Sequence, residues 1–225
     1  MNWATWTLGP RYGRFSGGKS ELKPHSNGLI VLGTMLLWSD WFTFNMGASK
    51  GTNTVQMELA VRSGMNTMLG GISSTITGYV IFLYHSNLQN VPLIANCLLG
   101  GLVSVTGCGA YVDPWAALLL GALAGALTYS SSLFILSKGI DDPVDSASVH
   151  FFNGILGVLG IGFFHRSKRL YATSGDGTLL GTQNAGSSSD DCLVHRACYP
   201  LFCCCQESVE FARHRRRRDH RSRRI

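Results

Sequence analysis

The sequence predicts an all-α, polytopic membrane protein with about five transmembrane helices and a disordered C-terminal tail. Charged residues are nearly absent between Gly28 and Phe164. Several apolar runs in this part approach the roughly 20 residues that a helix needs to cross a bilayer, and short polar breaks separate them. We therefore expect a polar N-terminal segment (residues 1–27), a transmembrane domain (28–164) and a basic, Cys-rich tail (165–225).

The net charge of +6 originates in the tail, where residues 211–225 carry eight Arg and one Asp. The rest of the chain is close to neutral, so we expect no nucleic-acid partner. The arginines could instead bind anionic lipid and Cys203–Cys205 could be acylated, or the tail could lack a selected function. The cysteines show neither a disulfide pattern nor zinc spacing, and we predict no metal and no cofactor.

The first predicted span, residues 28–47, places Leu37, Trp41 and Phe44 on one helix face. Such a stripe lines a pore or serves as plain packing surface. Asp40 stands out, because a carboxylate near mid-membrane costs about 2.5–3.5 kcal/mol on insertion scales. It is expected to face a cavity or a partner helix.

The next three spans are expected at residues 60–84, 91–112 and 114–136, after a polar loop at 50–58. The third span contains a kink-prone Thr106–Gly109 segment. The fourth begins with Asp113 as a cap and Pro114 at the first helical position. Its Gly121 and Gly125 follow the small-xxx-small pattern of tight helix contact.

The fifth predicted span, residues 143–164, carries a histidine that is a candidate functional residue. Asp142 stands where an N-cap belongs, Pro143 at the first helical position and Asp145 three residues after the cap. His150 then lies about two turns inside a membrane helix, which makes it a candidate functional residue. The alternative is a histidine that hydrogen-bonds a helix neighbour. A hydrolase site is disfavoured because neither a nucleophile nor a metal set accompanies these residues, so no enzyme is predicted.

Four segments resemble the ammonium transporter family of Amt, Mep and Rh proteins, and more specifically its Amt branch. They are VLGTMLLWSDWFTFNMG (31–47), GMNT (64–67), GLVSVTGCGAYVDPWAALLLGALAG (101–125) and GIDDPVDSASVHFFNGILGVLGIGFF (139–164). Their order and separations agree with the family. The resemblance covers about residues 9–164 and corresponds to the second half of such a transporter, from the sixth span through the tenth.

This resemblance implies a trimer in which each subunit has its own hydrophobic pore, lined by two histidines from two inverted halves. By the resemblance, His150 is the second-half histidine and Phe44 the outer gating phenylalanine. Trp41 and Leu37 pack around the pore, and Asp142 and Asp145 form the acidic cap of the histidine helix. The family has Gly at the position of Asp40 and usually Ser at that of Ala48, which alters the field and the hydrogen bonding at the pore entrance.

The function that the resemblance implies is ammonium or ammonia transport across a lipid bilayer, with methylammonium as an analogue, by a partial polypeptide in the plasma membrane. The alternative is a non-transporting membrane subunit that assembles with full-length relatives through its Gly121 and Gly125 face and modulates them. The two hypotheses differ in their effect on ammonium uptake: a transporter chain supports uptake, whereas a non-transporting subunit lowers the uptake by an intact transporter.

Overall fold

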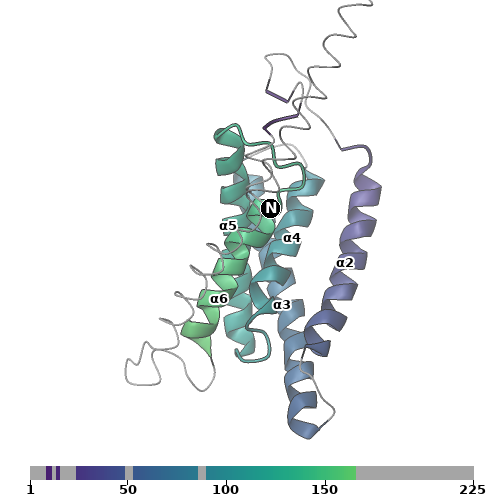
Figure 1. The fold of residues 1–225 in the computed structure, drawn as a ribbon, viewed down its shortest axis with the longest axis vertical. Coiled ribbons are helices and arrows are strands. Elements are labelled where there is room, and N and C mark those ends of the chain that lie inside the picture. The colour runs from purple at the N-terminus through teal and green to yellow at the C-terminus, as the bar shows by residue number, and fades with distance from the viewer. Residues whose placement is uncertain (1–8, 12–13, 16–23, 49–52, 86–89, 166–225) are drawn as a thin grey trace, which may run out of the picture.

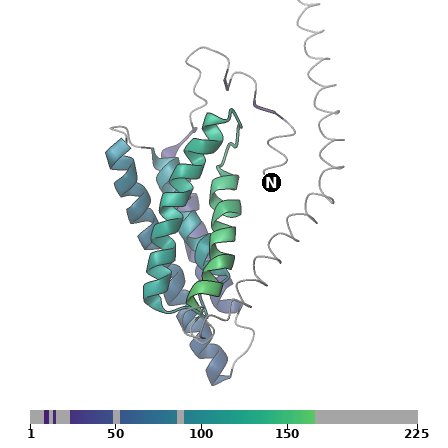
Figure 2. The same cartoon turned by 90° about the vertical axis from the view of Figure 1, so that its left-hand side faces the viewer.

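The computed structural model describes residues 9–11, 14–15, 24–48, 53–85 and 90–165. The predicted tail beyond residue 165 and most of segment 1–27 lie outside these residues. Within them the chain forms α2 (Asn27–Gly47), α3 (Thr54–His85), α4 (Val91–Thr106), α5 (Pro114–Ser137), the π-helix η1 (Ala147–Phe152) and α6 (Asn153–Phe164). Figures 1 and 2 show these helices side by side in one bundle.

The predicted fold class is confirmed: the described residues are helical apart from turns, short irregular segments and one isolated bridge between Val112 and His165. Four helical segments are long and apolar enough to cross a membrane: α2, α3, α5 and the continuous stretch of η1 and α6. The fifth, α4, has 16 residues and is therefore about 24 Å long. The chain is a multi-pass membrane protein.

Helices α2 and α5 begin and end within one residue of the predicted bounds. Ser26 caps α2, and its side chain accepts a hydrogen bond from the Leu29 backbone N–H at 3.3 Å. Pro114 is the first residue of α5 as predicted, because its fixed φ suits that position and its missing N–H is not needed there. Asp113 precedes it but makes no side-chain cap hydrogen bond.

Three predicted bounds are wrong. Helix α3 starts at Thr54 and includes part of the segment predicted as a polar loop. Helix α4 ends at Thr106, so the predicted kink is a helix end followed by turns. The buried Asn66 side chain donates hydrogen bonds to the carbonyl oxygens of Gly109 (2.7 Å) and Val112 (2.9 Å), which holds the chain beyond α4 in its non-helical path.

The third wrong bound is the start of the histidine helix, which begins at Ala147 and not at Pro143. Pro143 and Val144 form a turn, and Asp145 has a φ of 50°, a left-handed conformation that is uncommon for residues other than glycine. Helical geometry cannot pass through that conformation, so the helix starts after it.

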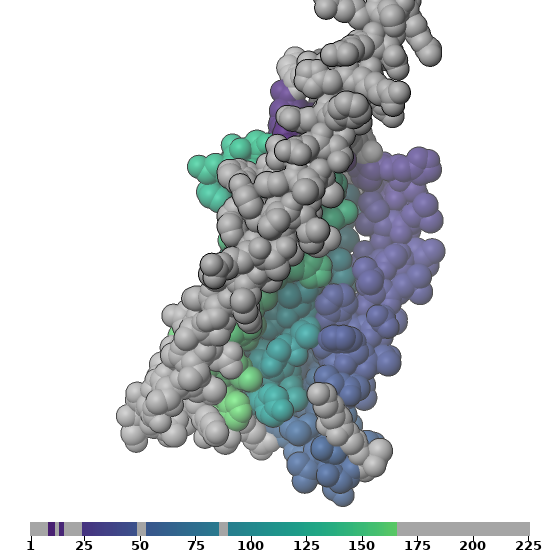
Figure 3. Space-filling view, in the orientation of Figure 1, coloured from purple at the N-terminus to yellow at the C-terminus, as the bar shows by residue number. Residues whose placement is uncertain are grey.

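Small residues bring α3 and α5 into close contact at the centre of the bundle. A Cβ added at Gly121 would meet the carbonyl oxygen of Gly70, and one added at Gly125 would meet the carbonyl oxygen of Ser74. The prediction that the Gly121 and Gly125 face docks other subunits is therefore wrong, because α3 already covers it. Helix α2 is the least buried of the four spans and has a free side of exposed residues; Figure 3 shows it along one flank of the bundle.

Candidate functional site

A pocket of about 350 Å³ lies between α2, the end of α4 and the histidine helix. Its lining consists mainly of apolar side chains and glycines, together with one imidazole, one indole and one hydroxyl. The residues are Trp41, Val103, Thr106, Gly107, His150, Gly154, Gly157 and Val158. Two of the four predicted pore residues, Trp41 and His150, thus come together from segments more than 100 positions apart in the sequence.

The indole of Trp41 is held in place by a hydrogen bond. Its Nε1–H donates to Thr106 Oγ1 at 2.9 Å, and the Thr106 hydroxyl donates to the Leu102 carbonyl oxygen at 2.8 Å. Sequence reasoning missed Thr106 as a site residue. Its one sequence signal is its position, because it is the last helical residue before the glycine-containing break after α4.

His150 lies inside η1, a π-helix of six residues. The three residues before it, Ala147, Ser148 and Val149, are buried, whereas His150 itself is exposed in this chain and borders the pocket. π-Helices are rare and occur frequently at functional sites. Nothing in the sequence pattern predicts this backbone geometry.

The two aspartates before the histidine helix contact different parts of the molecule. Asp142 Oδ2 accepts a hydrogen bond from the Ala147 backbone N–H at 2.8 Å. Asp145 Oδ2 accepts one from the Asn96 side chain of α4 at 3.0 Å, and burial raises the pKa of this carboxyl above its ordinary value. Asp142 therefore binds the first residue of η1, and Asp145 links the preceding loop to α4.

Phe44 and Leu37, the other two predicted pore residues, do not line the pocket. Phe44 is 64% exposed and Leu37 is 44% exposed. Both lie on the free side of α2, together with the exposed Asp40. Ala48 lies just beyond the helix, and its backbone N–H donates to the carbonyl oxygen of Phe44 at 3.1 Å. Within the described part of the chain, none of these side chains lines the pocket that His150 borders.

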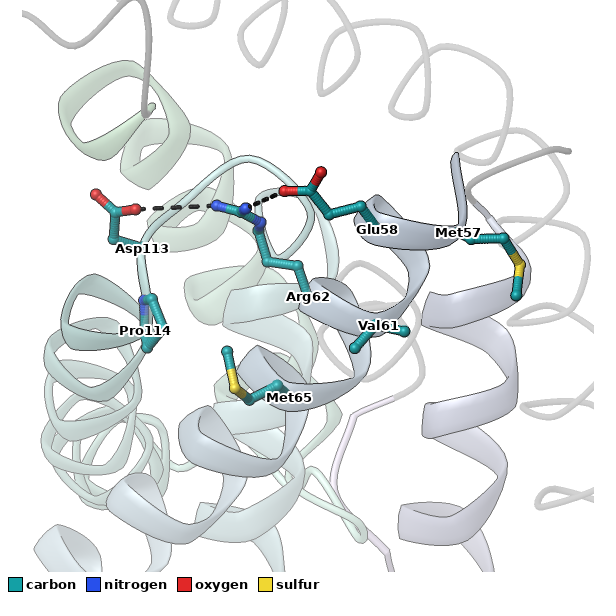
Figure 4. Close-up of a pocket in the computed structure, with 7 residues that line it drawn as sticks. All are labelled: Met57, Glu58, Val61, Arg62, Met65, Asp113 and Pro114. Atoms are coloured by element: carbon teal, nitrogen blue, oxygen red, sulfur yellow. Dashed lines mark hydrogen bonds and ion pairs between the residues drawn. The ribbon is translucent and has the colours of Figure 1, made fainter. Parts of the chain in front are cut away.

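Polar clusters lie at both ends of the bundle. At one end, Arg62 Nη2 lies 2.7 Å from Glu58 Oε1 and its Nη1 lies 4.0 Å from Asp113 Oδ1, beside a pocket of about 560 Å³ (Figure 4). This cluster joins the start of α3 to the turn before α5. Its apolar wall comes from Met57, Val61, Met65 and Pro114.

At the opposite end, Arg11 forms a bidentate ion pair with Asp141. Its Nε donates to Oδ2 at 2.7 Å and its Nη2 to Oδ1 at 2.8 Å, and Arg14 Nε lies 3.4 Å from Oδ1. The hydrogen bonds from Arg11 lower the pKa of the Asp141 carboxyl against the opposing effect of its burial. The Arg11–Asp141 contact links the segment before α2 to the loop before the histidine helix.

The arrangement defines a class of protein: a multi-pass helical membrane protein that holds a histidine and a tryptophan in one narrow, largely apolar pocket. Within the described residues no group of three or more His, Cys, Asp or Glu could hold a metal ion. The sequence also matches the model of the Ammonium Transporter Family over residues 3–197. The chain therefore belongs to the ammonium transporter family, and the match extends beyond the residues 9–164 predicted from the four motifs.

Individual relatives agree with this assignment. Ammonium transporter 3 of Dictyostelium discoideum is 36% identical over 170 residues, which cover 74% of this chain and 39% of that protein. Ammonium transporter Amt2 of Archaeoglobus fulgidus is 30% identical over 173 residues, or 76% of this chain and 36% of that one. The chain thus spans less than half the length of these relatives.

Solved structures show the same partial correspondence. A protein described as Sensor Amt Protein has a TM-score of 0.80 at 25% identity, with 92% of this chain and 51% of that one covered. Mep2 of Saccharomyces cerevisiae has a TM-score of 0.69 at 26% identity, with 84% of this chain and 45% of that one covered. The bundle therefore corresponds to about half of the fold of these proteins.

Proposed function

We propose that this chain takes part in ammonium or ammonia transport across the plasma membrane, as part of a hydrophobic pore lined by His150. The observation that carries the proposal is the shared pocket of Trp41 and His150 in a chain of the ammonium transporter family. The proteins named as ammonium transporters among its relatives support this substrate.

The chemistry of the pocket suits a small, weakly acidic cation. An ammonium ion is too strongly hydrated to enter an apolar pore unchanged, so it must exchange water for other partners. An aromatic face such as that of Trp41 attracts a cation, and a neutral imidazole accepts a hydrogen bond or a proton. His150 would therefore take the hydrogen bond or proton that the substrate gives up, while the apolar walls exclude larger hydrated ions.

We propose that residues corresponding to the other half of the family's fold complete the pore, because this chain corresponds to about half of its structural relatives. We propose that the first-half histidine of the family's pair comes from a complementary chain or segment. On the free side of α2, Phe44 would then border the pore entrance and Leu37 would pack against the complementary half. Asp40 and Ala48, where the family has Gly and Ser, would change the recruitment of the cation there.

The experiment is uptake of methylammonium in cells without their own ammonium transporters. The full chain is expressed with the first half of a related transporter, and His150→Ala is compared with the parent. We expect uptake to fall by about tenfold or more, as for loss of a group that transfers protons. His85→Ala is the matched control, since His85 is exposed at the end of α3 and does not line the pocket. Equal uptake by the parent and His150→Ala contradicts the proposal for His150.

We propose as a second candidate a non-transporting subunit that joins full-length relatives in a homo- or heterotrimer and modulates them. The free, apolar side of α2 favours this candidate: Leu29 and Leu36 are each 64% exposed. Co-expression of rising amounts of the chain with an intact transporter distinguishes the candidates. A dose-dependent loss of uptake supports the subunit, and constant uptake contradicts it.

A further inference from the structure

The π-helical backbone around His150 requires stabilising contacts from neighbouring residues. A π-helix closes its hydrogen bonds over five residues, and its wide turns are rare in proteins. Here it lasts for six residues and passes directly into the α-helix α6 at Asn153. At such a junction the backbone N–H and C=O groups change their hydrogen-bond partners. They must find new partners within the protein, because the apolar interior of a membrane protein offers no water.

The side chain of Asn153 binds two carbonyl groups of this segment. It is fully buried, and one N–H of its Nδ2 donates to the Ser148 carbonyl oxygen at 2.8 Å and is shared with the Val149 carbonyl oxygen at 3.3 Å. Both carbonyls belong to η1 and can only accept, so the amide must turn its NH₂ group toward them. Asn153 thus binds the backbone of the two residues that precede His150.

The same amide group is anchored to a neighbouring helix. Asn153 Nδ2 lies 2.7 Å from Thr128 Oγ1 of α5, which is also fully buried. Gly100 of α4 leaves room for this pair, because a Cβ there would lie 2.7 Å from Asn153 Nδ2 and would also meet Thr128 Oγ1. Three helices therefore meet at one polar contact directly behind η1.

We propose that Asn153 is a positioning residue for His150: anchored on Thr128, it holds the η1 backbone in the π-helical form that places the imidazole at the pocket beside Trp41. Neither Asn153 nor Thr128 lines the pocket, so Asn153 acts on His150 through the backbone. The relevance of this role to transport rests on the proposed function. The geometric claim itself is independent of uptake.

The experiment measures how accessible position 150 is in the full chain. All seven cysteines are replaced by Ala or Ser, His150→Cys is introduced as a probe, and the protein is placed in lipid nanodiscs. The rate of labelling by a water-soluble methanethiosulfonate reagent is followed by mass spectrometry. We expect Asn153→Leu to change this rate by about fivefold, the effect of one lost hydrogen bond on a conformational equilibrium. Thr128→Val should change it in the same direction by a smaller factor.

Two controls separate positioning from general loss of structure. Asn66→Leu removes another fully buried asparagine that binds two backbone carbonyls, and it should leave the labelling of Cys at position 150 unchanged. A Val103→Cys probe on α4, in the same pocket, should keep its rate in Asn153→Leu and Thr128→Val. Unchanged labelling at position 150 in both variants overturns the proposal, as does an equal change at position 103.

If Asn153→Leu does not fold, the nearly isosteric Thr128→Val variant tests the proposal alone. Its labelling rates at positions 150 and 103 are then compared in the same way. The result is also distinct from the test of the proposed function. Loss of uptake in His150→Ala with unchanged labelling in Asn153→Leu would leave the function standing and remove the positioning role. The reverse pattern would keep the positioning role and remove the function.

Discussion

The Nε1–H of Trp41 donates a hydrogen bond to Thr106 Oγ1 at 2.9 Å and so ties α2 to the end of α4 at the edge of the pocket. Helix α2 is otherwise the most exposed of the long helices. Polar contacts between membrane helices contribute about 0.6 kcal/mol on average and about 1.7 kcal/mol at most. This hydrogen bond is therefore a modest but specific constraint on where α2 lies.

A double-mutant cycle tests this contact. Trp41→Phe keeps an aromatic ring without the N–H, and Thr106→Val keeps the volume without the hydroxyl. We expect a coupling of about 0.5–1.5 kcal/mol in the free energy of unfolding, measured by SDS titration in bicelles. Additive effects of the two substitutions would show that the hydrogen bond contributes nothing.

The close approach of α3 and α5 predicts a strong effect at Gly125. A Cβ there would meet the backbone of Ser74 and would lie 3.1 Å from the backbone nitrogen of Gly78. Backbone cannot move aside as a side chain can, so Gly125→Ala should destabilise the bundle by about 1–3 kcal/mol.

The matched control is Gly33→Ala on α2, where an added Cβ meets nothing within 4 Å. That variant should keep or raise stability, by up to about 1 kcal/mol, because alanine favours a helix over glycine. The same SDS titration measures both. Similar changes at the two positions would contradict the idea that contact at Gly125, and not helix propensity, decides the outcome.

Apolar length was enough to predict where the spans lie. The bounds of α2 and α5 follow from largely apolar runs, of which α2 begins after the capping Ser26 and α5 begins at Pro114. The early start of α3 was missed because Thr54–Glu58 is polar, and a helix that extends beyond the bilayer needs no apolar side chains. A hydropathy pattern cannot show such an extension.

The geometry around His150 could not be predicted, because it depends on contacts between residues far apart in the sequence. Asn153 bonds Thr128 and Asp145 bonds Asn96, and neither pair is visible in a local pattern. The local cap motif therefore predicted a helix from Pro143, whereas these contacts and the left-handed Asp145 delay it to Ala147. Of the predicted pore residues, only Trp41 and His150 meet in one pocket within the described residues.

The Arg11–Asp141 contact predicts a dependence of stability on pH. Because Arg11 lowers the pKa of Asp141 in the folded chain, the contact stabilises the fold above the ordinary carboxyl pKa. The stabilisation is lost as the pH falls through the lowered value. Thermal unfolding of the parent and Asp141→Asn should therefore differ at pH 7, and the difference should begin to shrink as the pH falls below about 4 and disappear below the lowered pKa of Asp141. A difference that stays the same size as the pH falls from 7 through the carboxyl range would contradict this account.

Glu58→Gln provides the comparison for that measurement. Glu58 also pairs with an arginine, Arg62, but its side chain is 69% exposed. Exposed ion pairs contribute little to stability, so this variant should unfold close to the parent at pH 7. A loss as large as that of Asp141→Asn would show that burial of Asp141 is not what makes its contact important.

Asp40 lies near the middle of the 21-residue α2 and is exposed on its free side. If lipid surrounded this side chain, the carboxylate would oppose insertion by about 2.5–3.5 kcal/mol, which is on the order of a hundredfold in the insertion equilibrium. We expect instead that Asp40 faces a hydrated cavity or a partner helix in the assembled protein.

Asp40→Leu should then strongly increase insertion of isolated α2, measured by glycosylation mapping, while barely changing the inserted fraction of the full chain expressed with its complementary half. Ser39→Leu, one position away, should change neither measurement by a comparable amount, because a hydroxyl that donates to the Met35 carbonyl within the helix is already satisfied. An equal gain from Asp40→Leu in both settings would mean that the carboxylate contacts lipid and that the free side of α2 is not covered.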